Sequence, residues 1–276
     1  MKKIKLAFSP CPNDTFIFDA IVNKKIDLEG LDFEVTIADV EELNKKAIEG
    51  KLDLTKLSYY AYALMSESFD LCKSGSALGY GNGPLLVSKQ RILPNEVRFL
   101  RIAVPGRYTT ANFLLKHAFP GVSEPLEYLF SDIENAVVNR EVDAGVLIHE
   151  GRFTYARKGL RLITDLGDFW EKTSGHPIPL GCIAMRRTLP EETRHSFDRV
   201  MTRSVLYALE NPKDSKDFVA QHAQNQEPEI IQKHIDFFVN KFTVELGDKG
   251  QEAVNHFIAK VKKICKLPDQ PILPAN

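Results

Sequence analysis

Segments with the pattern of β-strands alternate with helical segments over the first two thirds of the chain. The strand-like segments cover residues 2–8, 31–38, 52–57, 100–104 and 142–148. The last of these is almost continuously apolar, which is typical of a strand with both faces covered. Since strands and helices that alternate in this way form layered sheets with helices on their faces, the sequence predicts an α/β fold.

Capping residues indicate where several helices begin and end. We expect Asp39 to cap a helix over residues 40–49, which Gly50 then ends. Asn13 or Asp14 is expected to cap the helix that follows the first strand. From Pro190 onward the periodicity is helical almost throughout.

The α/β pattern falls into two similar units, separated by crossovers near residues 89–98 and 173–183. We therefore predict a larger lobe from residues 1–90 and 180–276, which includes the C-terminal helices, and a smaller lobe from 91–179. This layout is that of a two-lobed periplasmic-binding-protein-like (type II) fold with an interlobe cleft. Such folds close over a ligand by hinge motion. The layout fits an enzyme as well as a non-catalytic binding protein.

Composition excludes several functional classes. The chain has 276 residues, a formal net charge of −1 and no basic block, which argues against nucleic acid as a partner. No apolar run is long enough to span a membrane, and the apolar part of the N-terminus, Leu6 to Phe8, is too short for a signal peptide. A cytoplasmic protein with a small-molecule substrate is expected. The sequence does not indicate an oligomeric state.

The chain offers no metal-binding pattern. Its four cysteines are far apart, without a C-x-x-C pair, so reduced thiols fit better than disulfides or a zinc site. H-E-x-x-H, histidine pairs at ligand spacing and acidic calcium loops are all missing from the sequence. We expect neither a metal nor an organic cofactor.

Polar residues follow several of the predicted strands directly. They are Ser9 to Asp14, Lys56 and Ser58, Thr109 and Thr110, and His149. Ligands of open α/β sheets bind outside the carboxyl ends of the strands. In a two-lobed protein these ends would face one cleft, so the set is the candidate site.

Two helix starts could hold anionic or polar groups of a ligand. Thr109, Thr110 and Ala111 begin a helix, where free N–H groups suit a carboxylate or a phosphate. Lys56 and Ser58 repeat the arrangement in the other lobe. The alternatives are an ordinary Thr cap in the first case, and a capped helix with a solvated lysine in the second.

His149 is the best candidate for chemistry, because imidazole titrates near neutrality and can accept and return a proton. It ends an apolar strand, whereas the other six histidines lie in helical or loop contexts. A structural role for His149 is the alternative. Asp14, at the end of the first strand, is the second candidate for a base. Cys11, between two prolines, could be a nucleophile with a lowered thiol pKa or a packing residue.

Six separated segments resemble one enzyme family, in order along the chain. They are SPCPNDTFIF (9–18), LTKLSY (54–59), ALGYGNGPL (77–85), AVPGRYTTA (103–111), IHEGRFTY (148–155) and PLGCI (179–183). The segments are similar to those of the 1,4-dihydroxy-6-naphthoate synthase family, which acts in the futalosine route to menaquinone.

The resemblance implies a cytoplasmic carbon–carbon lyase with a periplasmic-binding-protein-like fold. Such an enzyme cleaves cyclic dehypoxanthine futalosine to 1,4-dihydroxy-6-naphthoate and a small sugar-derived fragment, without a metal or an organic cofactor. Carried over by motif, His149 would be the proton acceptor. The substrate site would include Lys56, Leu57, Ser58, Thr110 and Ala111, with Asn44 as a further family position; Thr109 and Asp14 join them as strand-end residues.

A non-catalytic solute-binding protein for a small carboxylate is the competing prediction. It would need hydrogen-bond donors in its cleft but no base. The histidine at a strand end and the missing export signal favour the enzyme.

Overall fold

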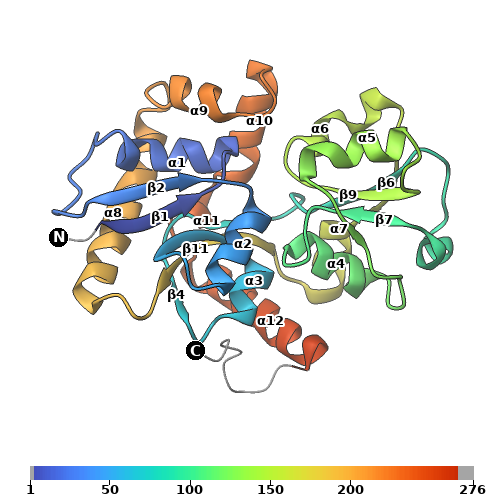
Figure 1. Cartoon of the computed structure of the whole chain (residues 1–276), viewed down its shortest axis with the longest axis horizontal. Coiled ribbons are helices and arrows are strands. Elements are labelled where there is room, and N and C mark those ends of the chain that lie inside the picture. Colours follow the sequence, from blue (N-terminus) through green and yellow to red (C-terminus); the bar gives the residue numbers. More distant parts are fainter. Residues whose placement is uncertain (1–2, 267–276) are drawn as a thin grey trace. The chain divides into compact units, whose positions relative to one another are not determined.

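The computed structural model describes residues 3–266, which form two compact units. Unit 1 combines the N-terminal part up to Leu78 with the part from Pro179 onward, and unit 2 runs from Gly79 to Ile178 (Figure 1). Residue 2 of the first expected strand and the ends of the larger lobe, residues 1–2 and 267–276, lie outside the described residues. Each unit is described by itself below.

Unit 1 is built on a six-stranded mixed sheet with the order β2-β1-β3-β11-β4, and β5 pairs with β11. Its strands are β1 (Ile4–Phe8), β2 (Phe33–Ile37), β3 (Leu54–Ser58), β4 (Phe69–Leu71), β5 (Ala77–Gly79) and β11 (Ile178–Arg186). β1 is parallel to both β2 and β3, whereas β11 is antiparallel to β3 and β4. The carboxyl ends of β1, β2 and β3 therefore lie at one edge of the sheet.

Helices cover this sheet. They are α1 (Pro12–Val22), α2 (Val40–Ile48), α3 (Tyr59–Leu64), α8 (Glu191–Glu210), α9 (Lys216–His222), α10 (Pro228–Phe238), α11 (Lys241–Val244) and α12 (Gly247–Cys265). α1 packs against α8, α9 and α10, and Figure 1 shows it lying along β1 and β2. The core between α1, α8 and the sheet is aromatic and aliphatic, with the rings of Phe8 and Phe18 stacked at 4.4 Å. Helices from the C-terminal part of the chain thus cover the first strand and helix of unit 1.

Local chemistry explains where the first helices begin. The prediction for Asp39 is confirmed: its side chain accepts a hydrogen bond from the backbone N–H of Glu41, and Gly50, at φ +75°, follows the helix end. The prediction that Asn13 or Asp14 caps α1 is wrong. α1 begins at Pro12, with Cys11 as its N-cap residue and without a side-chain cap. Proline suits the first helical position because its φ is already helical and no N–H is lost there.

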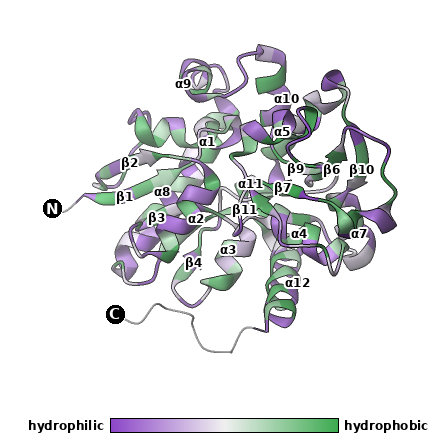
Figure 2. Ribbon diagram, turned by 45° about the vertical axis from the view of Figure 1, so that its right-hand side comes forward, coloured by the Kyte–Doolittle hydropathy of each residue, from purple (hydrophilic) through white to green (hydrophobic). Residues whose placement is uncertain are grey.

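Unit 2 contains a five-stranded sheet with the order β10-β6-β9-β7-β8. The strands are β6 (Leu85–Ser88), β7 (Ile102–Val104), β8 (Leu126–Glu127), β9 (Ala144–Leu147) and β10 (Arg161–Asp165). The helices are α4 (Thr110–Ala118), α5 (Ile133–Val138), α6 (Gly151–Thr154) and α7 (Leu166–Ser174), with short 3₁₀ segments η1 (Pro94–Phe99), η2 (Phe130–Asp132) and η3 (Tyr155–Lys158). In Figure 2 the strands β6, β7 and β9 are mainly hydrophobic in colour, and all four residues of β9 are buried.

Two segments differ in detail from the sequence prediction. Residues 79–90 were expected in the larger lobe, but β6 pairs with β9 and β10 in unit 2. The expected crossover at 173–183 contains the end of α7 and the first half of β11. Among the described residues, no helix has the length and apolarity to cross a membrane. None of the four cysteines, all of which are described, forms a disulfide.

Candidate functional site

A buried cluster of polar side chains lies at the carboxyl end of β1 in unit 1. The Asp14 carboxylate accepts hydrogen bonds from the hydroxyl of Ser9 (2.6 Å), the amide of Asn13 (2.9 Å) and the ammonium of Lys56 (2.6 Å). Asp14 lies in the first turn of α1, and Lys56 lies on β3 beside β1. Sheet pairing therefore brings together two candidates that are 42 residues apart in the sequence.

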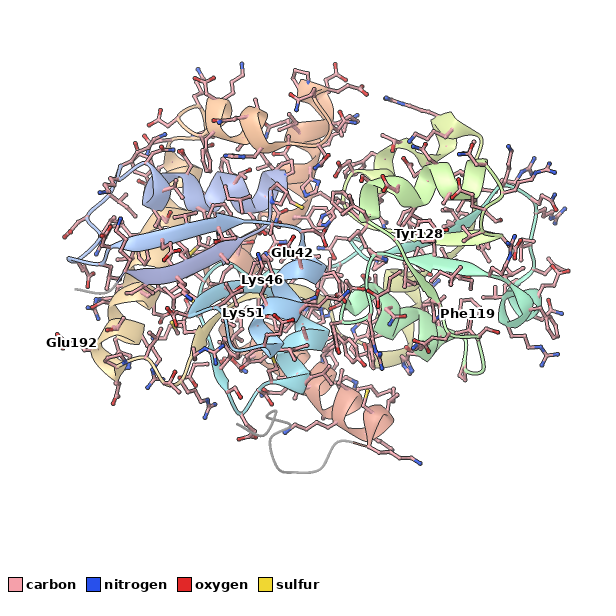
Figure 3. All side chains as sticks on the ribbon, viewed as in Figure 1. Glu42, Lys46, Lys51, Phe119, Tyr128 and Glu192 are labelled. Carbon is pink, nitrogen blue, oxygen red and sulfur yellow. The ribbon has the colours of Figure 1, made fainter. Side chains whose placement is uncertain are left out.

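The ion pair between Lys56 and Asp14 is removed from water, with side chains 6% and 1% exposed. The alternative of a solvated lysine is thus excluded. By contrast, Lys46 and Glu42 form a pair of similar length, 2.7 Å, on the exposed surface of α2 (Figure 3). Burial makes each charge of the Lys56 pair depend on its partner, because an isolated charge in the interior costs several kcal/mol.

Gly181 leaves room for the lysine side chain. A Cβ atom at this position on β11 would lie 2.8 Å from Cε of Lys56, closer than real Cβ contacts come. Gly181 pairs with Ser58 in the antiparallel ladder between β11 and β3. Any larger residue at this position of the PLGCI segment would thus collide with the Lys56 side chain.

A second polar group surrounds the end of β3. Asn44 on α2 accepts a hydrogen bond from the backbone N–H of Ser58 (3.0 Å) and donates to the Ser58 hydroxyl (3.2 Å). Its amide also donates to Glu41 at 3.2 Å. Lys56 and Ser58 share one face of β3, since side chains alternate along a strand. Leu57 points to the other face and is fully buried.

Three further side chains, those of His234, Cys11 and Cys182, lie near these polar residues. His234 of α10 lies with its Nε2 2.9 Å from Oδ1 of Asn13, and it is fully buried. Cys11 is 5% exposed, and its carbonyl accepts a hydrogen bond from the hydroxyl of Thr15. Burial raises the pKa of the Cys182 thiol on β11, and the nearby Lys56 charge opposes this only in part.

In unit 2 the candidate residues lie at the start of α4 and after β9. The hydroxyl of Thr109 donates to the Gly106 carbonyl (2.8 Å) and accepts from the backbone N–H of Asn112 (3.2 Å). Thr109 is therefore a helix cap, as the simpler of the two interpretations expected. Thr110 and Ala111 follow in the first turn, and both are 3% exposed.

His149 lies two residues beyond the end of β9 and is half-buried. Its backbone has φ +54°, a left-handed conformation that residues other than glycine seldom adopt. The imidazole meets the ring of Phe130 edge to face, with centroids 4.9 Å apart. Glu150 follows His149 directly in the chain. Burial, and to a lesser degree the charge of Glu134, raise the pKa of Glu150.

Arg152 ties the segment after His149 to the rest of unit 2. Its guanidinium donates to the Gly83 carbonyl, and to Oδ2 of Asp165 at 2.9 Å. Asp165 in turn caps α7 by accepting from the N–H groups of Gly167 and Asp168. Sequence reasoning did not single out Arg152, although it lies inside the IHEGRFTY segment.

The structure thus brings the predicted residues into two groups, one in each unit. Unit 1 holds Asp14, Asn44, Lys56, Leu57 and Ser58; unit 2 holds Thr109, Thr110, Ala111 and His149. Within unit 1, Asp14 bonds Lys56 and Asn44 bonds Ser58. Sequence reasoning gave no role to His234, Gly181 or Arg152. Gly181 and Arg152 lie inside two of the quoted motifs, and this was the only sequence signal that pointed to them.

Comparison with known proteins gives a consistent result over nearly the whole chain. Residues 4–263 match the model of a family described as menaquinone biosynthesis. A 1,4-dihydroxy-6-naphthoate synthase of Thermus thermophilus is 44% identical over 262 residues, 95% of either chain. The synthase of that name from Streptomyces coelicolor is 37% identical over 263 residues, 93% of this chain and 92% of the relative.

Solved structures agree with this result. A crystal structure of an Archaeoglobus fulgidus protein is 37% identical, with a TM-score of 0.89, and covers 96% of this chain and 98% of its own. The alkanesulfonate-binding protein SsuA from Xanthomonas axonopodis pv. citri has a TM-score of 0.69 at 14% identity and covers 98% and 96%. The second likeness concerns the fold alone, which is that of periplasmic binding proteins. Fold, motifs and relatives together show that the chain belongs to the menaquinone biosynthesis family.

Proposed function

We propose that this protein is a cofactor-free carbon–carbon lyase that converts cyclic dehypoxanthine futalosine to 1,4-dihydroxy-6-naphthoate, with His149 as the general base. Membership of the menaquinone biosynthesis family supports the pathway. The observation that carries the chemical assignment is His149 itself, a half-buried imidazole held on left-handed backbone just beyond β9.

A neutral imidazole can remove a proton from the substrate at neutral pH and so begin the carbon–carbon cleavage. The unusual backbone of His149 supports such a role, because strained residues persist where the surrounding structure holds them, and they cluster at functional sites. The edge contact with Phe130 limits rotation of the ring.

The substrate carboxylate would be bound at helix starts. The first turn of α4 at Thr110 and Ala111 supplies the positive end of a helix dipole. In unit 1, Ser58 accepts a hydrogen bond from Asn44, so that its own hydroxyl proton remains available for a ligand. The Asp14 carboxylate already accepts three hydrogen bonds, which suggests that it positions Lys56 rather than contacts the substrate.

Folds of this class close over a ligand by hinge motion, which would exclude water from a reactive intermediate. We also propose a cytoplasmic location, in keeping with a biosynthetic reaction.

The direct test is turnover by the purified protein. Cyclic dehypoxanthine futalosine is incubated with the protein in the presence of a chelator, and the naphthoate product is followed by liquid chromatography and mass spectrometry. We expect product without added metal or cofactor. Tight binding of the substrate without any product would instead favour a solute-binding protein. A requirement for added cofactor would contradict the cofactor-free mechanism.

A further inference from the structure

Asn82 is a buried amide whose side chain has no hydrogen-bond partner among the described residues. It lies in the connection between β5 and β6, within the ALGYGNGPL segment, and is 3% exposed. Neither Nδ2 nor Oδ1 bonds any other described residue. Burying an amide without compensating hydrogen bonds costs roughly 1–3 kcal/mol in proteins. Such a cost points to a partner outside the chain.

The loop around Asn82 is bonded to α7 on both sides of this residue. The backbone N–H of Gly81 donates to Glu171 on α7 at 2.6 Å, and the Pro84 carbonyl accepts from Leu166 at 2.9 Å. A Cβ atom on Gly83 would lie only 2.3 Å from Cα of Gly167, so the two backbones are in direct contact. These contacts hold the backbone on both sides of Asn82 against α7.

The same loop is connected to the segment of the proposed base. The guanidinium of Arg152 donates to the Gly83 carbonyl, next to Asn82, and to Asp165 at the start of α7. The backbone N–H of Arg152 donates to the carbonyl of His149, at 3.4 Å. One arginine thus fixes the turn that carries His149 and the loop that carries Asn82.

We propose that Asn82 is a specificity-determining residue, whose amide binds a hydroxyl group in the sugar-derived part of the substrate. This inference rests on the proposed function. An amide offers a donor and an acceptor, and an alcohol can satisfy both, whereas a carboxylate only accepts. Since both amide atoms lack a partner, the argument holds for either orientation of the amide.

The test compares wild type with Asn82→Leu, which keeps the size and removes both polar atoms. The KM for cyclic dehypoxanthine futalosine should rise about tenfold to a hundredfold, the effect of losing one or two hydrogen bonds. The melting temperature should stay the same or rise, because an apolar group replaces an unsatisfied amide. The naphthoate product lacks the sugar-derived part, so its Kd should change by less than about twofold.

A second variant, Asn82→Ala, gives the same readouts if the leucine disturbs folding. A KM near the wild-type value in either folded variant would overturn the role of Asn82 and leave the proposed function intact. Equal weakening of substrate and product binding would also overturn it, since it would indicate general damage to the site. Failure of wild type to bind and convert the substrate would contradict the proposed function, and with it the role of Asn82.

Discussion

The regions around the two groups of candidate residues differ in their hydrogen bonding and in their backbone conformation. In unit 1 the polar side chains bond one another: Asp14 has three donors around it, and Asn44 bonds both the backbone and the hydroxyl of Ser58. In unit 2, His149 adopts strained backbone, and Asn82 has no partner among the described residues. The first group is thus held together by its own hydrogen bonds, whereas unit 2 contains a strained backbone at His149 and an unsatisfied amide at Asn82. Substitutions in unit 1 should mainly cost stability, and those in unit 2 should mainly cost activity.

The largest effect is expected from His149→Asn. Asparagine adopts the left-handed conformation more readily than other residues with a side chain, so the backbone of the turn should be retained. It cannot accept a proton at neutral pH, and kcat should fall by about 10²–10⁴-fold. Substrate affinity should change far less, and the melting temperature should stay close to that of wild type.

Steady-state kinetics over a range of pH would check this prediction. The acid limb of the kcat/KM profile should report the base in the free enzyme and be lost in the variant. Turnover within about threefold of wild type would place the base elsewhere.

The buried ion pair of unit 1 should give the largest loss of stability. Lys56→Met leaves the carboxylate of Asp14 buried without its cation, which should lower the free energy of unfolding by roughly 3–5 kcal/mol. Adding Asp14→Asn removes the uncompensated charge and should recover much of the loss. Urea denaturation of the single and double variants measures both values.

The matched control is Lys46→Met on the exposed face of α2. Its pair with Glu42 has similar length but side chains 33% and 53% exposed, and its removal should cost less than about 1 kcal/mol. Equal losses for Lys56→Met and Lys46→Met would show that burial does not distinguish the two pairs.

How much could be predicted from the sequence depends on how far apart in the chain the interacting residues are. The strands around Phe8 and Val146 and the Asp39 cap depend on neighbours a few residues away, and they were predicted correctly. The carboxyl ends of β1, β2 and β3 lie at one edge because these strands are parallel, as the alternation of strands and helices predicts. The partner of Asp14 is 42 residues away, and His234 meets Asn13 across 221 residues. Only the packing of the sheet and α10 decides such contacts, so no local pattern could reveal them.

Thr110→Val tests the helix start in unit 2, with an intermediate effect. Valine keeps the shape of threonine and removes the hydroxyl. If that hydroxyl binds a charged group of the substrate, affinity should fall by about tenfold to a hundredfold, or 1.5–3 kcal/mol. Isothermal titration with substrate measures the change. Thr109→Val is the control for the cap itself: it should lower stability by about 1 kcal/mol. Unchanged affinity in Thr110→Val would remove this side chain from the proposed site.

The smallest effect is expected at Glu150, beside the proposed base. Its pKa is raised because burial disfavours the carboxylate and Glu134 adds a like charge. A raised pKa means that the stability contributed by the neutral form is present at acidic pH and is lost as the pH rises through the folded-state pKa. Glu150→Gln stays neutral, so it should match wild type near pH 4 and be more stable at pH 7, by about 0.5 kcal/mol. Thermal unfolding at the two pH values measures this difference. A variant that is less stable than wild type at pH 7 would show that the ionised carboxylate of Glu150 is needed in the fold, and unit 2 would then resemble unit 1 in this respect.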